Sequence, residues 1–169
     1  MLFRSSEGED RLRRGLYTEW RRSSPYPSMA TFDAPNREVC TLRRGRTNTP
    51  LQALVTLNDP VYLEAAQALA KVTWAMPGTD AERLQAAFRR VLIRPPQTEE
   101  LRSLRALLEQ ARSGYQAAPA RAAEFVGLKV SPDASPPPEA VELAVWTTVG
   151  NVLLNLDETL MKQIGRAHV

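Results

Sequence analysis

The chain has very few of the residues on which most metal and nucleophilic sites depend. Its 169 residues include one histidine, His168, and one cysteine, Cys40. These two residues cannot supply a four-ligand zinc site, and a single cysteine cannot form an internal disulfide. We therefore predict no metal site. We also expect Cys40 to be a buried, inert thiol rather than a reactive one.

Several catalytic and cofactor motifs are also missing. The sequence contains no HExxH, GxSxG, P-loop or GxGxxG pattern, and no CxxCH motif for covalent haem attachment. A Ser-His-Asp triad would have to use His168, which is next to the last residue, where side chains are usually poorly ordered. No reaction class follows from these residues, so enzymatic activity stays open. No cofactor is expected in this chain.

The positive charge is concentrated in the first part of the chain. Residues 1–50 carry ten Arg, no Lys and six Asp or Glu, a balance of +4 within a total of +3. These arginines alternate with acids and prolines, a pattern that argues against a nucleic-acid partner. No apolar run approaches the roughly 20 residues that span a bilayer. We therefore expect neither nucleic-acid binding nor a transmembrane segment.

Thirteen prolines interrupt the chain and separate segments with helical periodicity. Thr49 and Gln52 flank Pro50 in a capping-box pattern with proline at the first helical position. Asp59 stands before Pro60 in the same way. Thr79 and Glu82 form another capping box, and Thr98 is expected to cap the next helix. No segment alternates like a strand. We predict an all-α fold, an irregular bundle of five to seven helices with proline-rich connections.

Three helices can be described further. After Pro50, the residues Leu51, Leu54, Val55 and Leu57 follow at the spacing of an amphipathic helix. The helix that begins near Thr98 is expected to close at Ser113-Gly114. The last helix is expected to be the longest, from Glu139 to about Ile164, with polar residues beside its apolar stripe.

Three arginines, Arg43, Arg44 and Arg46, lie within four residues and repel one another unless anions are close. One interpretation is an anion-binding pocket for a sulfate, phosphate or carboxylate group, formed by these arginines and Asn48. The favoured alternative is an internal polar network that fixes a loop. Its candidate members are Asp33, Arg37, Glu38, Asn58, Asp59, Asn155 and Asp157. If the last helix packs against this stretch, Asn155 and Asp157 are predicted to meet Arg43, Arg44 or Arg46.

The stretch SMATFDAPNREVCTLRRGRTNTPLQALVTLNDP, which begins at Ser28, resembles the signature of a planctomycete-type family, domain of unknown function 1553. The pieces TFDAP, REVC, RTNTPLQAL and LNDP occur in order at close spacing. The segments RRGLYTEWRRSSPYPSM and VWTTVGNVLLNLDETL are similar to the family too. The resemblance therefore runs from about Arg11 to Lys162.

The resemblance implies a domain organisation and a context. It implies a single helical domain over residues 11–164, with residues 1–10 disordered or a remnant of an upstream region and 165–169 a foreign or frayed tail. Members of the family usually form the C-terminal part of long secreted proteins that carry a cytochrome-c-like domain. Haem is therefore expected only in a separate upstream domain, and the location is expected to be periplasmic or secreted.

Two functions follow as hypotheses. The first is an accessory or structural domain that packs on the upstream domains of the same polypeptide, with an exposed apolar patch in the region from Leu12 to Trp20. The alternative is a module that binds or processes anionic, sulfated polysaccharide through the Arg-rich signature.

Overall fold

The computed structural model describes residues 17, 25, 27–35, 38, 40, 42, 45, 47–128 and 137–160. The chain separates into two compact units, Met1–Gln52 and Ala53–Val169. The described residues contain eight helices, six of them with seven or more residues, and no strand. The predicted all-α class is confirmed. The domain boundaries over residues 11–164 stay a prediction.

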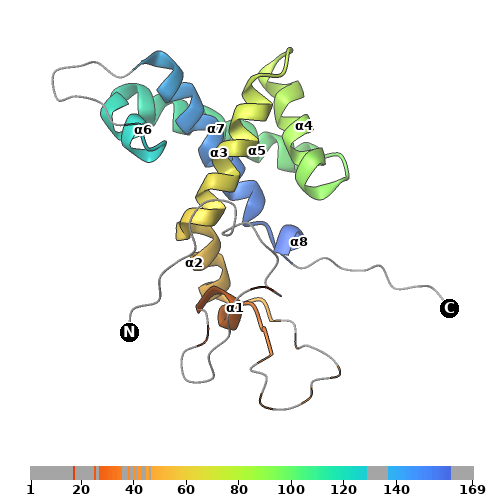
Figure 1. Cartoon of the computed structure of the whole chain (residues 1–169). Coiled ribbons are helices and arrows are strands. Elements are labelled where there is room, and N and C mark those ends of the chain that lie inside the picture. The colour runs from red at the N-terminus through yellow and green to blue at the C-terminus, as the bar shows by residue number, and fades with distance from the viewer. Residues whose placement is uncertain are drawn as a thin grey trace. The chain divides into compact units, whose positions relative to one another are not determined.

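In chain order the helices are α1 (Pro27–Thr31), α2 (Pro50–Asn58), α3 (Pro60–Trp74), α4 (Asp80–Leu92), α5 (Thr98–Ala117), α6 (Pro119–Phe125), α7 (Pro138–Leu154) and α8 (Asp157–Leu160), as Figure 1 shows. Five of these eight helices begin at a proline. The first helical position lacks an intrahelical partner for its N–H, so proline is tolerated there. The boundary between the two units lies inside α2.

The core of the second unit is built around α7, which contacts α3, α5 and α6. Trp146, Val145, Val149 and Leu153 of α7 are fully buried. They belong to one apolar cluster with residues of α3, α4 and α5, whose buried members there are Ala70, Leu84, Ala87, Phe88, Leu104 and Leu108. Burial of this apolar surface is the main stabilising contribution to the unit.

Helices α3 and α7 approach each other closely because their contact is built from small residues. Ala66 and Ala70 of α3 are buried, and Gly150 of α7 lies against Ala66. A Cβ atom on Gly150 would lie 2.9 Å from the Ala66 carbonyl oxygen. Glycine is therefore required at this position for the observed packing distance.

At the starts of α3, α4 and α5, the structure confirms the predicted caps Asp59 and Thr79 and moves the predicted cap Thr98. Asp59 accepts a hydrogen bond from the Val61 N–H at 2.9 Å and caps α3. Thr79 and Glu82 form the expected capping box at the start of α4. Thr98 is instead the first residue of α5, and Gln97 occupies the cap position, where its N–H donates to Glu100 at 2.6 Å. The predicted cap was therefore one residue late.

The predicted end of α5 at Ser113-Gly114 is wrong, because the helix continues to Ala117. Tyr115 packs against the apolar core, and its ring stacks on Phe125 with centroids 6.0 Å apart. These contacts hold the final turn in place. Gly114 is therefore accommodated inside the helix.

The prediction for the last helix is also wrong within the described residues. α7 has 17 residues and α5 has 20, so α7 is not the longest. The chain leaves α7 after Leu154, and the Thr159 hydroxyl donates to the Leu153 carbonyl at 2.8 Å. This bond satisfies a terminal carbonyl and stabilises the break before α8. Residues 161–164 lie outside the described residues.

Cys40 is exposed, so the prediction of a buried thiol is wrong. Cys40 itself belongs to neither a helix nor a strand. The expected patch from Leu12 to Trp20 falls outside the described residues except for Tyr17, which is exposed. Residues 1–10 and 165–169 also fall outside them.

No helix in the part of the chain that the structure describes has the length and apolar character needed to cross a bilayer.

Candidate functional site

Gln52 is the centre of a polar network in the first unit. Its side chain is only 3% exposed. The side-chain oxygen accepts from the Thr49 N–H at 3.1 Å, and Nε2 donates to the Thr31 carbonyl at 2.9 Å and to the Thr47 hydroxyl at 3.1 Å. The Gln52 N–H bonds to the Thr49 hydroxyl at 3.3 Å, which completes the predicted capping box. The buried amide therefore has partners for its oxygen and both hydrogens.

Asp33 belongs to the same network, because it bonds to Thr47, which is also a partner of Gln52. Its carboxylate accepts from the Thr47 N–H at 2.8 Å and from the Thr47 hydroxyl at 2.9 and 3.0 Å. Asp33 has φ of 57°, a left-handed conformation that aspartate adopts more readily than most residues. These bonds hold Asp33 and Thr47, which are 14 positions apart in the chain, next to each other.

The predicted anion-binding set is only partly within the described residues. Arg43, Arg44 and Arg46 lie outside them, as does Arg37 of the predicted network, and Asn48 is exposed. Glu38 is also exposed. The anion-binding hypothesis and the network hypothesis therefore both stay predictions. The capping box occupies the N–H groups of Thr49 and Gln52, so these two donors are not available to an anion at the start of α2.

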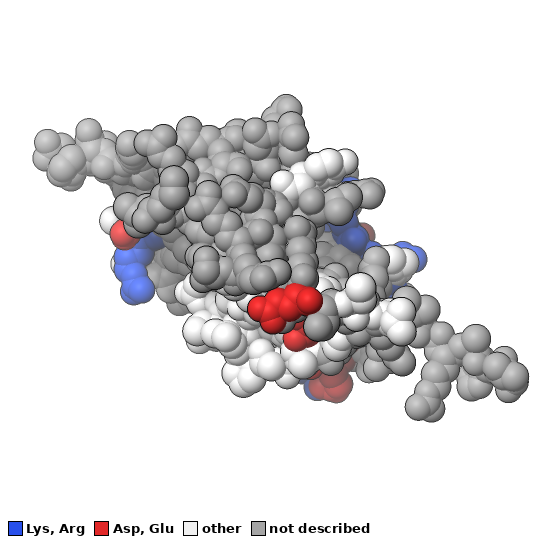
Figure 2. All heavy atoms as spheres, turned by 60° about the horizontal axis from the view of Figure 1, so that its bottom comes forward, with Lys and Arg blue, Asp and Glu red and all other residues white. Residues whose placement is uncertain are grey.

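The orientation of α2 is the reverse of that of an ordinary amphipathic helix. Leu51 and Leu54 are each 58% exposed and Leu57 is 41% exposed. The polar residues Gln52 and Thr56 are buried, at 3% and 0% exposure. The leucines that define the apolar spacing thus face outward, and we refer to Leu51, Leu54 and Leu57 as the α2 leucine face. In the view of Figure 2, most of the described atoms belong to residues without charge.

The end of α2 is tied to α7 in the second unit. The buried Thr56 hydroxyl donates to Asn155 Oδ1. Asn151 Nδ2 donates to the Leu57 carbonyl at 3.3 Å. Asn155, one of the predicted network residues, therefore meets the signature through Thr56. Its predicted contact with the signature arginines involves residues outside the described ones.

Asn58 and Asp59, two further network candidates, serve the helix ends on which they stand. The Asn58 amide donates to the Leu54 carbonyl at 2.8 Å, and Asp59 caps α3 through Val61. Burial, with Asp59 nearby, raises the pKa of Tyr62 above its usual value. These contacts are local, and they account for the two side chains without a ligand.

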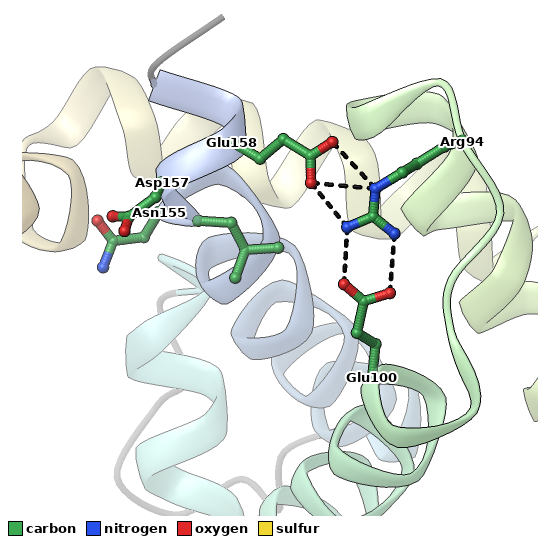
Figure 3. A pocket seen from close by; sticks show the side chains of 6 residues that line it. Arg94, Glu100, Asn155, Asp157 and Glu158 are labelled. Carbon is green, nitrogen blue, oxygen red and sulfur yellow. Dashed lines mark hydrogen bonds and ion pairs between the residues drawn. The ribbon is translucent and has the colours of Figure 1, made fainter. Parts of the chain in front are cut away.

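A cluster centred on Arg94 occurs where the α4–α5 connection meets α8. Arg94 forms a bidentate pair with Glu100, with nitrogen–oxygen distances of 2.7 and 2.9 Å, and a second pair with Glu158 at 2.7 to 3.1 Å. Figure 3 shows the guanidinium between the two carboxylates. The same guanidinium lies 4.9 Å from the ring centroid of Phe88, a favourable cation–π distance.

The Arg94 cluster lines an open pocket of about 410 Å³. Leu156, Asn155 and Asp157 complete the lining, and Figure 3 shows Asn155 and Asp157 on the side away from Arg94. The pocket therefore contains two of the predicted network residues. The sequence offered no signal for Arg94 and Glu158, because 64 positions separate them.

The ionisation of the Arg94 cluster argues against acid–base chemistry. Hydrogen bonds from Arg94 lower the pKa of Glu100 to about 2 and also lower the pKa of Glu158. The two carboxylates in turn raise the pKa of Arg94 above its already high value. A general acid or base works best with a pKa near the operating pH, and none of these groups approaches that range. Arg94 already uses its donors on Glu100, Glu158 and the Pro95 carbonyl, so it is not arranged to bind an anion.

A second arginine cluster joins three helices. Arg112 of α5 bonds to Glu142 of α7 at 2.8 and 2.9 Å and to Asp80 of α4 at 2.9 Å. These contacts raise the pKa of Arg112 above its usual value. Both arginine clusters therefore join elements that are far apart in the chain. Among the described residues, no group of three or more His, Cys, Asp or Glu side chains is placed to hold a metal ion.

Comparison with known proteins gives one result. The family model described as PSD1, protein of unknown function (DUF1553), matches residues 2–108, which is more than half of the chain. The match includes the signature and the helices from α1 to α4. No curated protein and no solved structure matches the chain.

Proposed function

Since this chain belongs to the DUF1553 family of proteins of unknown function, we propose that it acts as an accessory domain that packs on upstream domains of a longer extracytoplasmic polypeptide. The α2 leucine face is the surface that we assign to this packing. The upstream domains include the cytochrome-c-like domain that the family resemblance implies, and haem belongs to that domain rather than to this one.

The observation that supports the proposal is the orientation of α2 within the family signature. Three leucines face outward while Gln52 and Thr56 are buried. Covering one leucine side chain contributes about 1.5 to 3 kcal/mol relative to full exposure, so the partly exposed leucines still favour a covered state. Large contiguous apolar patches on a protein surface mark interaction sites, and the three leucines follow one another at helical spacing on α2.

The polar clusters of the described residues favour a structural role over catalysis. Arg94 and Arg112 are each held by two carboxylates and join separate helices. The Gln52 side chain donates to the Thr47 hydroxyl, and the Asp33 carboxylate accepts from the Thr47 N–H. Each of these groups has protein partners that account for its position. A domain that positions other domains requires this kind of rigid polar scaffold and no reacting side chain.

Site-specific thiol labelling in a Cys40→Ser background tests the proposal. The variant Leu54→Cys is labelled in the 169-residue chain and in the full-length gene product, and the modified position is identified by mass spectrometry. We expect labelling in the full-length protein to be slower by at least about tenfold, because the upstream domains cover the site. Leu128→Cys is the matched control. Leu128 is also an exposed leucine, and it follows α6 in the chain, far from the signature in sequence. Equal labelling rates of Leu54→Cys in both proteins would contradict the proposal.

A second candidate function is binding or processing of an anionic, sulfated polysaccharide through Arg43, Arg44, Arg46 and Asn48. The observation that favours it is the contact between Asp33 and Thr47, the two residues that flank the Arg-rich part of the sequence, where the Thr47 N–H and hydroxyl both donate to the Asp33 carboxylate. A binding segment whose flanking residues are already fixed loses less conformational entropy when it binds a ligand. The basic residues of this segment then supply charge-assisted contacts to sulfate groups.

Thermal unfolding with and without heparin, as a sulfated polysaccharide probe, tests this second candidate. A rise in Tm that disappears in Arg46→Ala supports it. Arg102→Ala is the control, because Arg102 is an exposed arginine on α5. No change in Tm with heparin at low ionic strength would rule the candidate out, since such contacts are strongest there.

A further inference from the structure

α8 is a short helix that makes few contacts with the rest of the second unit. It has four residues, and none of them is buried. A helix of this length is not stable by itself in water, because one turn provides too few hydrogen bonds to offset the entropy lost on ordering it. α7, which precedes it, buries eight residues in the core. The stability of α8 therefore depends on its contacts with other elements.

Two side chains of α8 bond to other elements. The Glu158 carboxylate accepts from the Arg94 guanidinium at 2.7 to 3.1 Å, and the Thr159 hydroxyl donates to the Leu153 carbonyl at 2.8 Å. The side chains of Glu158 and Arg94 are 48% and 35% exposed, so both charges remain in contact with water when they separate. Separation of this ion pair therefore avoids the large cost of leaving a buried charge unpaired.

The point at which α8 can separate from the fold lies directly after Asn155. The Asn155 N–H bonds to carbonyls of α7, and its side chain accepts from Thr56, so this residue is held in place. Beyond it, Leu156 and Leu160 are only half-buried. Residues 156–160 thus have a fixed start and a weakly covered remainder, and we refer to them as the α8 strap.

Arg94 keeps its position by contacts that do not involve the α8 strap. Its guanidinium forms the bidentate pair with Glu100 at 2.7 and 2.9 Å, as Figure 3 shows, and lies 4.9 Å from the ring centroid of Phe88. A group that is already oriented loses less entropy when its partner binds. Arg94 is therefore ready to receive Glu158 again after the two have separated.

We propose that the α8 strap opens and closes as one unit while the rest of the second unit stays folded, and that the ion pair between Glu158 and Arg94 controls this equilibrium. Among the described residues, this pair makes three of the four side-chain hydrogen bonds that join the strap to other elements. Segments with few buried contacts open locally in many folded proteins.

Opening of the α8 strap has two consequences for the surface of the second unit. It uncovers the part of the apolar core on which Leu156 packs. It also frees the Arg94 donors that Glu158 occupies in the closed state. The strap lies on α8, apart from the α2 leucine face, so this inference does not depend on the proposed function.

Amide hydrogen exchange of the 169-residue chain, followed by NMR, tests the proposal. The Thr159 and Leu160 N–H groups bond to the Leu156 carbonyl at 2.8 and 3.2 Å, so they exchange when the strap opens. We expect their protection factors to be at least about a hundredfold lower than those of the buried part of α7. Low concentrations of urea should reduce the protection of α7 and leave that of the strap unchanged, because only global unfolding exposes a large surface.

Glu158→Gln tests the role of the ion pair. It should lower the protection factors of Thr159 and Leu160 by about threefold to tenfold and leave those of α7 unchanged, because a partly exposed ion pair contributes modestly. Asp157→Asn is the matched control. It removes the same charge from the neighbouring exposed residue of α8, where only the helix dipole is affected, and should change strap protection by no more than about twofold.

Ionic strength provides a second measurement on the same variants. Raising NaCl from about 0.05 M to about 0.5 M should lower strap protection in the wild-type chain and not in Glu158→Gln, because salt screens the ion pair. Strap amides with the protection and the urea dependence of α7 would show that the strap opens only with the whole fold. A Glu158→Gln chain that behaves like Asp157→Asn, or that loses protection equally in α7, would also overturn the proposal.

Discussion

α2 and α7 place their apolar residues in opposite ways. α7 is apolar around most of its circumference and buries eight of its 17 residues, because α3, α5 and α6 surround it. α2 has a clear apolar stripe, yet it exposes Leu51, Leu54 and Leu57. The comparison shows that periodicity identifies the apolar face of a helix but does not establish that this chain covers it.

The buried polar residues of the two helices differ as well. Thr147 of α7 is fully buried and donates to the Leu143 carbonyl of its own helix at 2.7 Å. Gln52 of α2 bonds to Thr31 and Thr47 from another segment, and the Thr56 hydroxyl bonds to Asn155 in addition to the Ala53 carbonyl of its own helix. The orientation of α2 therefore depends on long-range hydrogen bonds, whereas that of α7 depends on packing.

The largest effect is expected from Trp146→Ala in α7. The side chain is the largest of the fully buried ones, and its removal leaves a cavity in the core. The free energy of unfolding should fall by about 3 to 5 kcal/mol. Urea unfolding measures the change. Trp146→Phe should cost less, because it keeps most of the volume and removes an indole N–H for which the described structure provides no partner. Equal losses in the free energy of unfolding for the two variants would show that packing around α7 is not the dominant contribution of Trp146 to stability.

The next largest effect is expected at the contact between α3 and α7. Gly150→Ala places a Cβ atom 2.9 Å from the Ala66 carbonyl oxygen, so the helices must separate. The expected loss is about 1 to 3 kcal/mol. Gly114→Ala is the matched control, because nothing lies within 4 Å of its added Cβ. It should stabilise the helix by up to about 1 kcal/mol. Chemical denaturation of both variants measures whether each substitution raises or lowers the free energy of unfolding.

Thr56→Val tests the long-range bonds that orient α2. The substitution removes a buried hydroxyl and leaves the half-buried Asn155 Oδ1 without this donor, and it should cost about 1 to 3 kcal/mol. Thr147→Val removes a hydroxyl that bonds only to its own helix, and should cost less. Urea unfolding compares the two variants. A larger loss of stability for Thr147→Val would show that α2 does not depend on its long-range hydrogen bonds more than α7 depends on bonds within its own helix.

Acid is expected to weaken the connection between α8 and the rest of the second unit. The pKa of Glu100 is about 2 in the folded protein and that of Glu158 is lowered, both below the ordinary glutamate value. Carboxylates with a depressed folded-state pKa stabilise the fold above their unfolded pKa, and this stabilisation is lost as pH falls through the folded value. Tm should therefore fall between about pH 5 and pH 2, and less steeply in Glu100→Gln. Glu109→Gln, at an exposed glutamate of the same helix, is the matched control. Solvent screening keeps this effect smaller than those in the core.

The smallest effect on the isolated chain is expected from Leu54→Ser. An exposed residue on the α2 leucine face contributes little to stability, so the change should stay within about 0.5 kcal/mol. Thermal unfolding measures it. A loss of several kcal/mol would show that Leu54 is covered within the chain in solution and would remove the contrast between α2 and α7.

Helix starts were predictable from the sequence because caps are local. Thr49 with Gln52, Asp59 with Pro60, and Thr79 with Glu82 satisfy terminal N–H groups within three residues, and each was identified from its spacing. Helix ends were less predictable. α5 continues past Gly114 because Tyr115 stacks on Phe125, a contact that no local pattern announces.

The polar clusters could not be predicted from the sequence. Arg94 meets Glu158 across 64 positions, and Arg112 meets Glu142 across 30. Opposite charges occur throughout the chain, and only the packing of the helices determines which of them come together. The crowded arginines of the signature therefore gave no indication of Arg94 and Arg112, the two arginines that join helices.

The amino-acid sequence by itself determined the helical class, the positions of most helix starts and the membership of the DUF1553 family, since each depends on residues close together in the chain. Only the tertiary structure decided which way α2 faces, where α7 ends and which carboxylates hold Arg94. These features depend on contacts between distant segments, and the free energy of such contacts is determined by three-dimensional packing rather than by local spacing.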